Sequence, residues 1–424
     1  MAIGIGSPDA ILADEQVAAI VAQALDDARW DGKRVLVLVP DLTRTAPIPL
    51  MFRIVYRALA DRVAALDFMV ALGTHPPLPD EKLYELMGIT PEEHRANYSK
   101  AKFLNHRWKD PGALVSIGTL SESEVEEISG GLFRMSVNLE VNRAVTEYDH
   151  ILIVGPVFPH EVVGFSGGNK YLFPGIAGQE IIDFFHWLGA TITNPMIIGH
   201  KYTPVRAVVD LAASKVPAER SCFAMVVKEQ GLAGLYFGTP EDAWSAAADL
   251  SAQLHVTYID NPFKLVLSCA PAMYTDIWVA GKCMYKLEPV VEPGGKLIIY
   301  APHIGVVSHT HGEVIEEIGY HVRDYFAKQW DKFKRYPWGV VAHSTHVRGI
   351  GTFEDGVERP RIDVVLATRI SEAKCRQINL GYMNPDAVAV ADYQGRENEG
   401  ILCVPHAGEM LYRLRGPRME HGVW

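Results

Sequence analysis

The stretch RVLVLVPDLTRTAPIPLMFRIVYRALADRVAALDFMVAL, from Arg34 to Leu72, predicts the fold class of this chain. Arg34 to Pro40 and Leu66 to Leu72 are short apolar runs rich in β-branched residues, which is typical of buried strands. Leu50 to Val63, between them, has the apolar spacing of a helix. A strand, a helix and a second strand in this order indicate an α/β fold with a parallel-rich sheet.

The alternation of strands and helices continues beyond this stretch. Further strands are predicted over Ile151 to Val157 and Phe223 to Val227, and helices over Gln179 to Leu188, Val205 to Ala213 and Pro240 to Leu254. We therefore expect residues 1–258 to form a first α/β domain.

A second, smaller α/β domain is predicted over residues 263–398. Asp260-Asn261-Pro262 marks the boundary, because proline disfavours helix in the residue before it and Asn and Asp favour turns. Its predicted strands are Leu265 to Cys269, Lys296 to Tyr300, Gly339 to Ala342 and Ile362 to Ala367, and its predicted helices include Gly319 to Lys328 and Asp386 to Tyr393. We expect residues 400–424 to return to the first domain as a strand and a helix.

Composition excludes several classes of protein. The 424 residues are 48% hydrophobic, so they can bury sizeable cores, and the net charge of -11 disfavours nonspecific binding to nucleic acid. No segment approaches about 18 uninterrupted apolar residues, as a membrane helix would require. The five cysteines form no Cys-x-x-Cys pair and are expected to be reduced. A cytoplasmic protein without membrane or nucleic-acid partners is the expectation.

The segment from Pro159 to Lys170, PHEVVGFSGGNK, has the composition of a cofactor site. His160 precedes Lys170 by ten residues across a glycine turn, and His186 follows Lys170 by sixteen. Glycine permits close approach of the backbone to a ligand, the lysine amine can bond covalently, and histidine can move protons or bind a metal. A nucleotide triphosphate loop is excluded, because Asn169 precedes the lysine and Tyr171 follows it.

Other polar residues follow the predicted strands. Asp41-Leu42-Thr43-Arg44 follows the first, Gly73-Thr74-His75 the next, and His106 and His160 are expected in loops at the same edge. Open α/β sheets bind ligands beyond the carboxyl ends of their strands. Two histidines could exchange protons at opposite faces of one carbon, although a single histidine is more often structural.

The second domain contributes a cation and several histidines. Lys282, at the end of a predicted helix, could bind a substrate carboxylate or simply be solvated. The pairs His309/His311 and His343/His346 could bind zinc or could hydrogen-bond a hydroxylated substrate.

Taken together, these motifs resemble the nickel-pincer lactate racemase family over most of the chain. The motifs that carry the resemblance are Asp41 to Arg44, Gly73 to His75, Asn105-His106, Pro159-His160, Gly168-Asn169-Lys170, Pro174-Gly175-Ile176, His186 and Gly281-Lys282. The resemblance implies two α/β domains with the active site in the cleft between them. It also implies a nickel-pincer nucleotide (Ni(II)-pyridinium-3,5-bisthiocarboxylate mononucleotide) attached covalently to Lys170, with His186 as the nickel ligand.

The resemblance assigns the remaining roles. Asp41, Leu42, Thr43 and Arg44 would bind the cofactor, His106 and His160 would be the paired acid/base residues, and Arg44 and Lys282 would bind the substrate carboxylate. The implied reaction inverts C2 of a small anionic 2-hydroxy acid by reversible hydride transfer to the cofactor. Separate cofactor-biosynthesis proteins would mature the enzyme, and homo-oligomerisation is left open.

Two departures from the family's lactate enzymes bear on the substrate. Trp278-Val279-Ala280 stands where those enzymes have a glutamine, and Pro77 stands where they have an arginine. With His309, His311, His343, His346 and Arg348 expected near the substrate, we predict a polar substrate such as an aldonate rather than lactate. The alternatives are a zinc-dependent hydrolase using these histidines and a noncatalytic sugar-acid binding protein.

Overall fold

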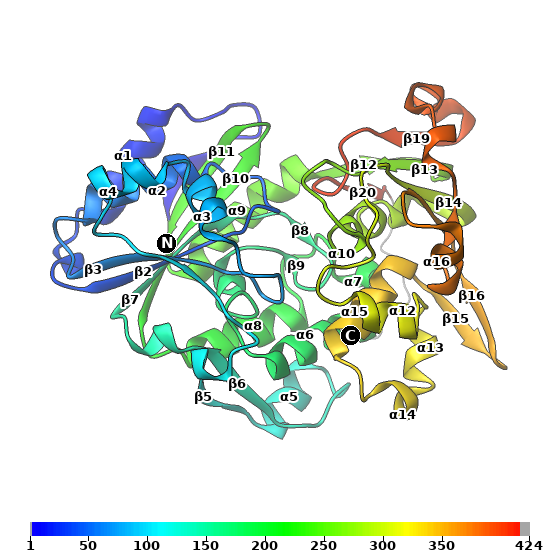
Figure 1. The fold of residues 1–424 in the computed structure, drawn as a ribbon, viewed down its shortest axis with the longest axis horizontal. Helices are drawn as coiled ribbons and strands as arrows, with labels where there is room; N and C mark the ends of the chain where they lie inside the picture. The colour runs from blue at the N-terminus through cyan, green and yellow to red at the C-terminus, as the bar shows by residue number, and fades with distance from the viewer. Residues whose placement is uncertain (1, 416–424) are drawn as a thin grey trace. The chain divides into compact units, whose positions relative to one another are not determined.

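The computed structural model describes residues 2–415, and these residues fold into two α/β units (Figure 1). The first unit comprises the chain up to Phe158 together with Phe165–Ile182 and Arg206–Leu254. The second comprises Pro159–Gly164, Asp183–Val205 and the chain from His255 onward. The α/β class is therefore confirmed, but two segments that we expected in the first domain belong to the second.

A seven-stranded sheet is the centre of the first unit, with the strand order β1-β11-β10-β7-β2-β3-β4. The five strands from β10 to β4 are mutually parallel, whereas β11 runs antiparallel to its neighbours β10 and β1. The strands are β1 (Ile3–Gly6), β2 (Arg34–Val39), β3 (Ala65–Val70), β4 (Phe103–Asn105), β7 (His150–Pro156), β10 (Glu219–Lys228) and β11 (Gly231–Gly238). A separate antiparallel pair is formed by β5 (Leu114–Leu120) and β6 (Val137–Asn142).

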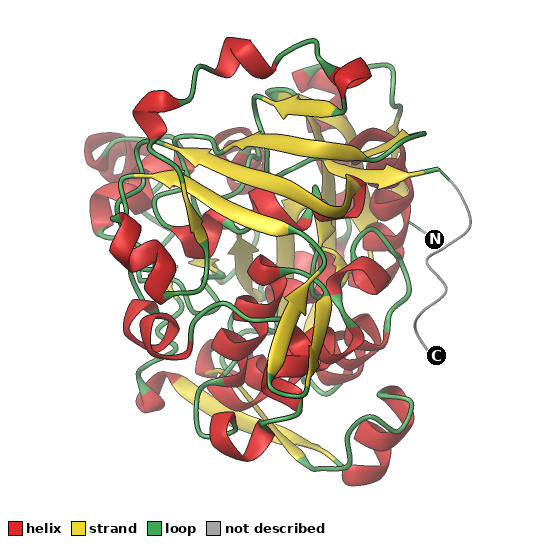
Figure 2. Ribbon diagram, turned by 90° about the vertical axis from the view of Figure 1, so that its right-hand side faces the viewer, coloured by secondary structure: helices red, strands yellow, loops and turns green. Residues whose placement is uncertain are grey.

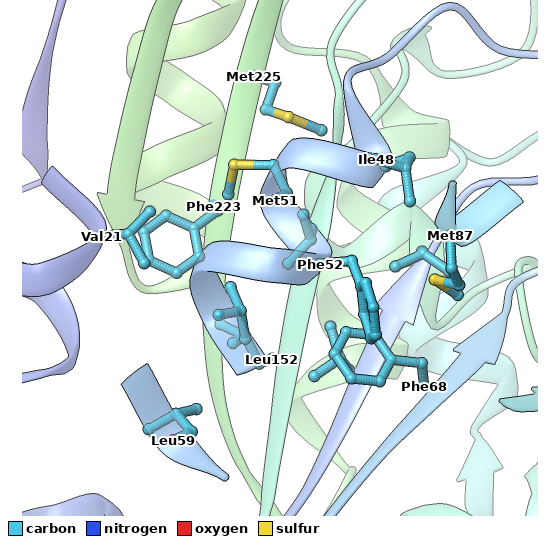
Figure 3. Close-up of a cluster of buried hydrophobic side chains, with 14 of the residues drawn as sticks. Val21, Ile48, Met51, Phe52, Leu59, Phe68, Met87, Leu152, Phe223 and Met225 are labelled. Carbon is cyan, nitrogen blue, oxygen red and sulfur yellow. The ribbon is translucent and has the colours of Figure 1, made fainter. Parts of the chain in front are cut away.

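One face of this sheet is covered by helices α1, α2 and α3, and Figure 3 shows the apolar side chains between the two layers. Helix α2 (Ile48–Leu59) buries Ile48, Met51, Phe52, Val55 and Leu59, the three- and four-residue spacing of one helical face. Phe52 packs edge-on against Phe68 of β3, with ring centroids 5.0 Å apart. The alternate strand residues are buried as well, so both faces of the sheet are covered.

The helices of the first unit are α1 (Asp14–Leu25), α2, α3 (Asp80–Met87), α4 (Pro91–Asn97), α5 (Glu122–Ile128), α8 (Pro204–Ser214) and α9 (Pro240–His255). Helix α6 (Gln179–Ile192) begins in the first unit and continues into the second, and α7 (Asn194–Ile197) follows it. The predicted strands and helices of this half of the chain are confirmed to within a few residues. Apolar periodicity was sufficient to predict these elements, because each of them packs one apolar face against the core of this unit.

The second unit has a five-stranded parallel sheet with the order β18-β17-β14-β13-β19 (Figure 2). Its strands are β13 (Phe263–Cys269), β14 (Val291–Ala301), β17 (Asp363–Thr368), β18 (Gly381–Tyr382) and β19 (Ile401–Val404). Three short pairs accompany the sheets: β12 (Val256–Ile259) with β20 (Leu411–Leu414), the hairpin β15 (Gly351–Glu354) with β16 (Val357–Pro360), and β8 (Pro159–His160) with β9 (Gly164–Phe165).

The helices of the second unit are short: α10 (Ile277–Ala280), α11 (Lys282–Tyr285), α12 (Gly312–Ile318), α13 (Arg323–Ala327), α14 (Trp330–Phe333), α15 (Trp338–Arg348) and α16 (Glu372–Gln377). The predicted strand Gly339 to Ala342 is wrong, since it lies in α15. Every residue from Gly339 to Val347 is buried, so this helix has no exposed face whose polar residues would reveal a helical period. Asp386 to Tyr393 forms 3-10 turns rather than one helix.

The chain after residue 400 does not return to the first unit where the structure describes it. Strand β19 pairs in parallel with β13, and β20 pairs with β12, so both belong to the second unit. This segment joins the second unit because its backbone hydrogen-bonds to strands β13 and β12. Pairing between residues so far apart in the chain leaves no local sequence pattern that would predict it. The end of the predicted return, residues 416–424, lies outside the described residues. No helix among those described is both long and apolar enough to cross a membrane.

Candidate active site

The first unit's sheet has a topological switch point at β2. The chain adds β3 and β4 on one side of β2, and β7 and β10 on the other. The loops that follow the neighbouring strands β2 and β7 therefore lead away in opposite directions. Open α/β sheets bind ligands between two such loops, at the carboxyl ends of the strands. Asp41 to Arg44 form the loop after β2, and the glycine-rich segment leading to Lys170 follows β7.

At this edge, Asp41 and His75 form a close pair. His75 Nδ1 lies 2.5 Å from Asp41 Oδ2, while Thr43 donates to Asp41 Oδ1 from its backbone N–H at 3.0 Å and its hydroxyl at 2.6 Å. The Asp41 side chain is 8% exposed and that of His75 is 27% exposed. A buried carboxylate thus orients an accessible imidazole, the arrangement that a general base requires.

The charges around Asp41 keep it ionised. Burial alone would raise its pKa, but the adjacent His75, the hydrogen bonds from His75 and Thr43, and the charge of Arg44 outweigh burial and hold the pKa of Asp41 well below its usual range. The carboxylate can therefore hold His75 in one orientation and stabilise its protonated form.

The segment that carries Lys170 is fixed from several sides. The Arg206 guanidinium donates to the carbonyls of Phe165 and Gly167 and stacks 4.1 Å over the Trp244 ring, whose Nε1 donates to Ser166 O at 2.9 Å. The backbone therefore holds Lys170 in the 3-10 turn Gly168–Tyr171 as a half-buried side chain on a rigid loop.

The side chain of Asn169 fixes the same turn by two hydrogen bonds. Its Nδ2 donates to Asp210 Oδ1 at 3.0 Å and to Glu241 Oε1 at 2.6 Å, and the residue is 1% exposed. These two acceptors lie on α8 and α9, so the turn is tied to two helices of the first unit.

Gly168 is required by this packing. Its φ is +59°, and a Cβ there would come within 2.9 Å of Trp244 Cβ. We expect Gly168→Ala to destabilise the first unit by about 2–4 kcal/mol, the sum of left-handed strain and overpacking. Gly32→Ala is the matched control, because Gly32 has φ +70° with no atom within 4 Å of the added Cβ, so only strain of about 1 kcal/mol applies. Urea unfolding midpoints measure the difference, and equal shifts would contradict the packing argument.

The turn that carries Lys170 packs against strand β7 through Tyr171. The Tyr171 phenol lies against Gly155, where a Cβ would come within 1.9 Å of the phenolic oxygen. Burial raises the pKa of Tyr171, while the charge of Arg44 opposes that rise, so the phenol stays neutral beside Arg44 and Asp41. The backbone N–H of Gly73 donates to Gly175 O at 2.9 Å and joins the His75 loop to the Lys170 segment. We call Asp41, Arg44, His75, Lys170 and Tyr171 the carboxyl-edge cluster.

His106 follows β4 at the same edge of the sheet, where its backbone N–H donates to Val70 O at 3.3 Å, but its side chain is packed in the core. It is 0% exposed, its Nε2 is 3.0 Å from Ala177 O, and its Nδ1 is 3.2 Å from Asn142 Nδ2. Both ring nitrogens are therefore engaged in the core. This environment weighs against the predicted acid/base role of His106, and His75, which we had assigned no role, has the geometry that the role needs.

The buried state of His106 makes stability depend on pH. Burial lowers its pKa from 6.5 to about 4, although the bond to Ala177 O partly opposes that shift. Between pH 6.5 and about 4 the unfolded chain binds a proton that the folded chain does not, so the free energy of unfolding falls as pH is lowered. We expect His106→Gln to reduce this slope by up to about 1.4 kcal/mol per pH unit. Denaturation at several pH values measures the slope, and an unchanged slope would contradict a neutral buried imidazole.

In the second unit, His160 is buried and has a partner in each protonation state. The Val162 N–H donates to its Nδ1 at 3.1 Å, which suits the neutral ring, and Glu161 Oε2 lies 3.2 Å from the same nitrogen, which suits the charged ring. An imidazole stabilised in both forms can exchange protons reversibly.

His186 lies on α6, beside the start of α15. One helical turn earlier, Asp183 Oδ1 accepts the Gly339 N–H at 2.8 Å, and a Cβ on Gly339 would lie 3.7 Å from His186 Nδ1. The absence of a side chain at Gly339 therefore leaves room at the His186 ring for a further ligand.

Trp278 organises the other histidines of this unit. Its ring stacks on His343, with centroids 4.1 Å apart, and contacts His311 at 4.4 Å. Burial lowers the pKa of His343 well below its usual range, and the nearby imidazoles of His346, His311 and His186 lower it further. Lys282 is buried and lies 4.7 Å over the Tyr274 ring. The sequence analysis noted Trp278 only because it lies where the family's lactate enzymes have a glutamine. Its contacts with two histidines become visible only in the folded structure.

The zinc alternative gains no support from this arrangement. Among residues 2–415, no group of three or more His, Cys, Asp or Glu side chains is placed to bind a metal ion. The predicted His309/His311 pair does not act as a unit: the backbone N–H of His309 donates to Asp276 Oδ2 at 3.0 Å, whereas the His311 ring contacts Trp278. The five cysteines are free thiols, as expected.

The carboxyl-edge cluster lies where open α/β sheets bind ligands, and comparison with known proteins shows what this chain resembles. Residues 8–196 match the model of the lactate racemase N-terminal domain. The lactate racemase of Lactiplantibacillus plantarum is 26% identical over 287 residues, and that of Thermoanaerobacterium thermosaccharolyticum 24% over 295 residues. Each match covers 66% of this chain and 63% of the relative, so it spans less than two thirds of those relatives' length.

Solved structures agree. A protein from Thermotoga maritima is 33% identical, with a TM-score of 0.89 over 97% of this chain and 100% of its own. The lactate racemase apoprotein of Thermoanaerobacterium thermosaccharolyticum shares the fold at 19% identity, with a TM-score of 0.68 over 93% of this chain and 92% of its own. The chain therefore contains a lactate racemase N-terminal domain.

Proposed function

We propose that this protein is a racemase or epimerase that inverts C2 of a small 2-hydroxy acid. The observation that carries the proposal is the Asp41–His75 pair, which lies with Arg44 and Lys170 at the switch point of the sheet in a chain that contains a lactate racemase N-terminal domain. A base for the hydroxyl proton and a cation for the carboxylate are the groups that this reaction needs first.

We further propose a nickel-pincer nucleotide as the cofactor. Two features fit such a group: Lys170 offers an amine on a rigid loop, and Gly339 places no side chain against the His186 ring, where a Cβ would lie 3.7 Å from Nδ1. Lys170 would attach the cofactor, His186 would ligate nickel, and Asp41 to Arg44 would contact it. When bound, the cofactor would supply the hydride acceptor that amino-acid side chains lack.

The protein's own groups would supply the proton transfers. His75 would accept the 2-hydroxyl proton, while Asp41 would orient the ring and stabilise its charge. His160, with a partner for each protonation state, would serve the opposite face of the substrate. Arg44 and Lys282 would bind the carboxylate, and the apolar surroundings of Lys282 would strengthen its charge-assisted bonds. His75 thus replaces His106 in the pair that the sequence predicted.

For the substrate we propose a polar 2-hydroxy acid such as an aldonate. Support comes from the imidazoles of His311 and His343, which the Trp278 ring holds in place and which can hydrogen-bond hydroxyl groups. Burial lowers the pKa of His343, so its ring is neutral and can either donate or accept.

The test is an epimerisation assay on protein produced together with the cofactor-biosynthesis proteins. D-gluconate and D-mannonate differ only at C2, so chromatography and NMR of C2-deuterated gluconate would follow their interconversion; L-lactate is assayed in parallel. We expect mannonate to form with deuterium retained at C2. Inversion of lactate but of neither sugar acid would overturn the aldonate assignment. Inversion of none of them by protein with the intact adduct would overturn the activity itself.

A further inference from the structure

A cavity of about 420 Å³ lies wholly within the second unit and takes no part in the proposed reaction. Five segments line it: the end of α6 with Thr193 and Asn194, the buried Glu288, the start of α13 at Arg323, the end of α15 at His346, and the β15–β16 hairpin. Neither His186 nor Lys282 is among its lining residues. Its volume suits a small metabolite.

Three buried groups of this cavity offer hydrogen bonds that the protein does not use. Glu288 is 0% exposed; its Oε1 accepts the Ile350 N–H at 2.7 Å, its Oε2 has no partner among the described residues, and burial raises the pKa of this carboxyl, which disfavours its negative charge. His346 is 4% exposed, and its Nε2 has no hydrogen-bond partner within the described part of the chain. Asn194 is also 4% exposed; its Nδ2 donates to Tyr285 O at 3.0 Å, which leaves its Oδ1 unpartnered among the same residues. Buried polar atoms without partners are destabilising, so a ligand or water is expected to satisfy them.

Backbone strain accompanies these groups. Thr193 adopts φ +91°, a left-handed value that is strongly disfavoured for a β-branched residue. This conformation turns the chain between α6 and α7 and places Asn194 at the cavity wall. Strain of this kind persists where a site depends on it.

Guanidinium groups give the cavity positive charge. Arg359 is exposed on the hairpin, and the Arg323 side chain is 39% exposed and paired with Asp324. Arg361 lies deeper, where it donates to the carbonyls of Val291 and Glu288. The more exposed arginines therefore form the mouth, and the buried histidine and asparagine form the floor.

We propose that this cavity is a second ligand site, which binds a small hydroxylated anion. The arginines would bind the carboxylate or phosphate at the mouth. At the floor, Asn194 Oδ1 would accept a hydrogen bond from a hydroxyl group, and His346 Nε2 would accept or donate one according to its tautomer. A guanidinium binds carboxylate and phosphate alike. The structure therefore assigns what the two kinds of ligand share, which is an anionic group on a hydroxylated carbon chain. The inference does not depend on the proposed racemase activity.

Calorimetric titration of the full chain tests the site with four probes: D-gluconate, D-glucose 6-phosphate, inorganic phosphate and D-glucose. We expect saturable binding of gluconate or glucose 6-phosphate, and the tighter of the two identifies the anion. Phosphate and glucose should each bind at least about tenfold more weakly, because each lacks half of the recognised groups. Equal affinity for inorganic phosphate would show an adventitious ion only and would overturn the proposal, as would the absence of saturation by any probe.

Variants locate the binding. Arg359→Ala, at an exposed position that folding does not need, and His346→Gln should each weaken binding by about tenfold. Arg376→Ala is the control, since Arg376 is an exposed arginine of the same unit, paired with Glu372 on α16. Lys282→Ala alters the proposed substrate site instead, so it should leave intact the binding that Arg359→Ala weakens. Loss of binding in Lys282→Ala but not in Arg359→Ala would place the ligand at the proposed substrate contact and overturn the inference.

Discussion

Lys170→Ala and Lys170→Arg proteins should both lack the covalently attached cofactor and lose racemisation to background, a drop of at least about 10³-fold. The turn that holds Lys170 is fixed by Arg206, Trp244 and Asn169, so either substitution should leave the fold intact. Arginine keeps the positive charge but has no nucleophilic amine. The pair of variants therefore separates a covalent role from a purely electrostatic one.

The measurements are intact mass, nickel content and activity on protein matured with the biosynthesis proteins. Lys215→Ala is the matched control, because Lys215 also belongs to the first unit but pairs with Glu124, outside the carboxyl-edge cluster. It should keep the adduct and its full activity. An adduct mass that persists in Lys170→Arg would show that another residue carries the cofactor.

His75→Gln should lower kcat by about 10²–10⁴-fold with little change in KM, whereas His106→Gln should keep kcat within a few-fold of the wild type. His75 is the accessible partner of an ionised carboxylate, so it can exchange protons. His106 has both nitrogens engaged in the core, and its loss should instead cost about 1–3 kcal/mol of stability.

Asp41→Asn provides the positioning control for this prediction. An amide cannot stabilise the charge that His75 gains when it accepts a proton, so kcat should fall while KM and the unfolding temperature stay close to those of the wild type. Steady-state kinetics and thermal unfolding of the three variants distinguish the roles. A large fall in kcat for His106→Gln with none for His75→Gln would restore the original pair of His106 and His160.

The sequence by itself determined the elements of the first unit and much of its ligand-binding edge. Strands β2, β3 and β7 and helices α2, α6, α8 and α9 follow from apolar periodicity, which is a local property. The rule that ligands bind at the carboxyl ends of parallel strands placed Asp41 and His75 at one edge. The rule could not show which of His75 and His106 is the better candidate for the acid/base role. The two differ in burial and in hydrogen-bond partners, and neither property can be read from the sequence.

Only the tertiary structure decided how distant segments combine. It moved Pro159–Gly164 and Asp183–Val205 into the second unit, paired β19 with β13, and made a fully buried helix of a segment that reads as a strand. It also assembled the arginine-lined cavity from five separate segments. These features depend on packing between residues far apart in the chain, and such contacts leave no spacing pattern in the sequence from which they could be read.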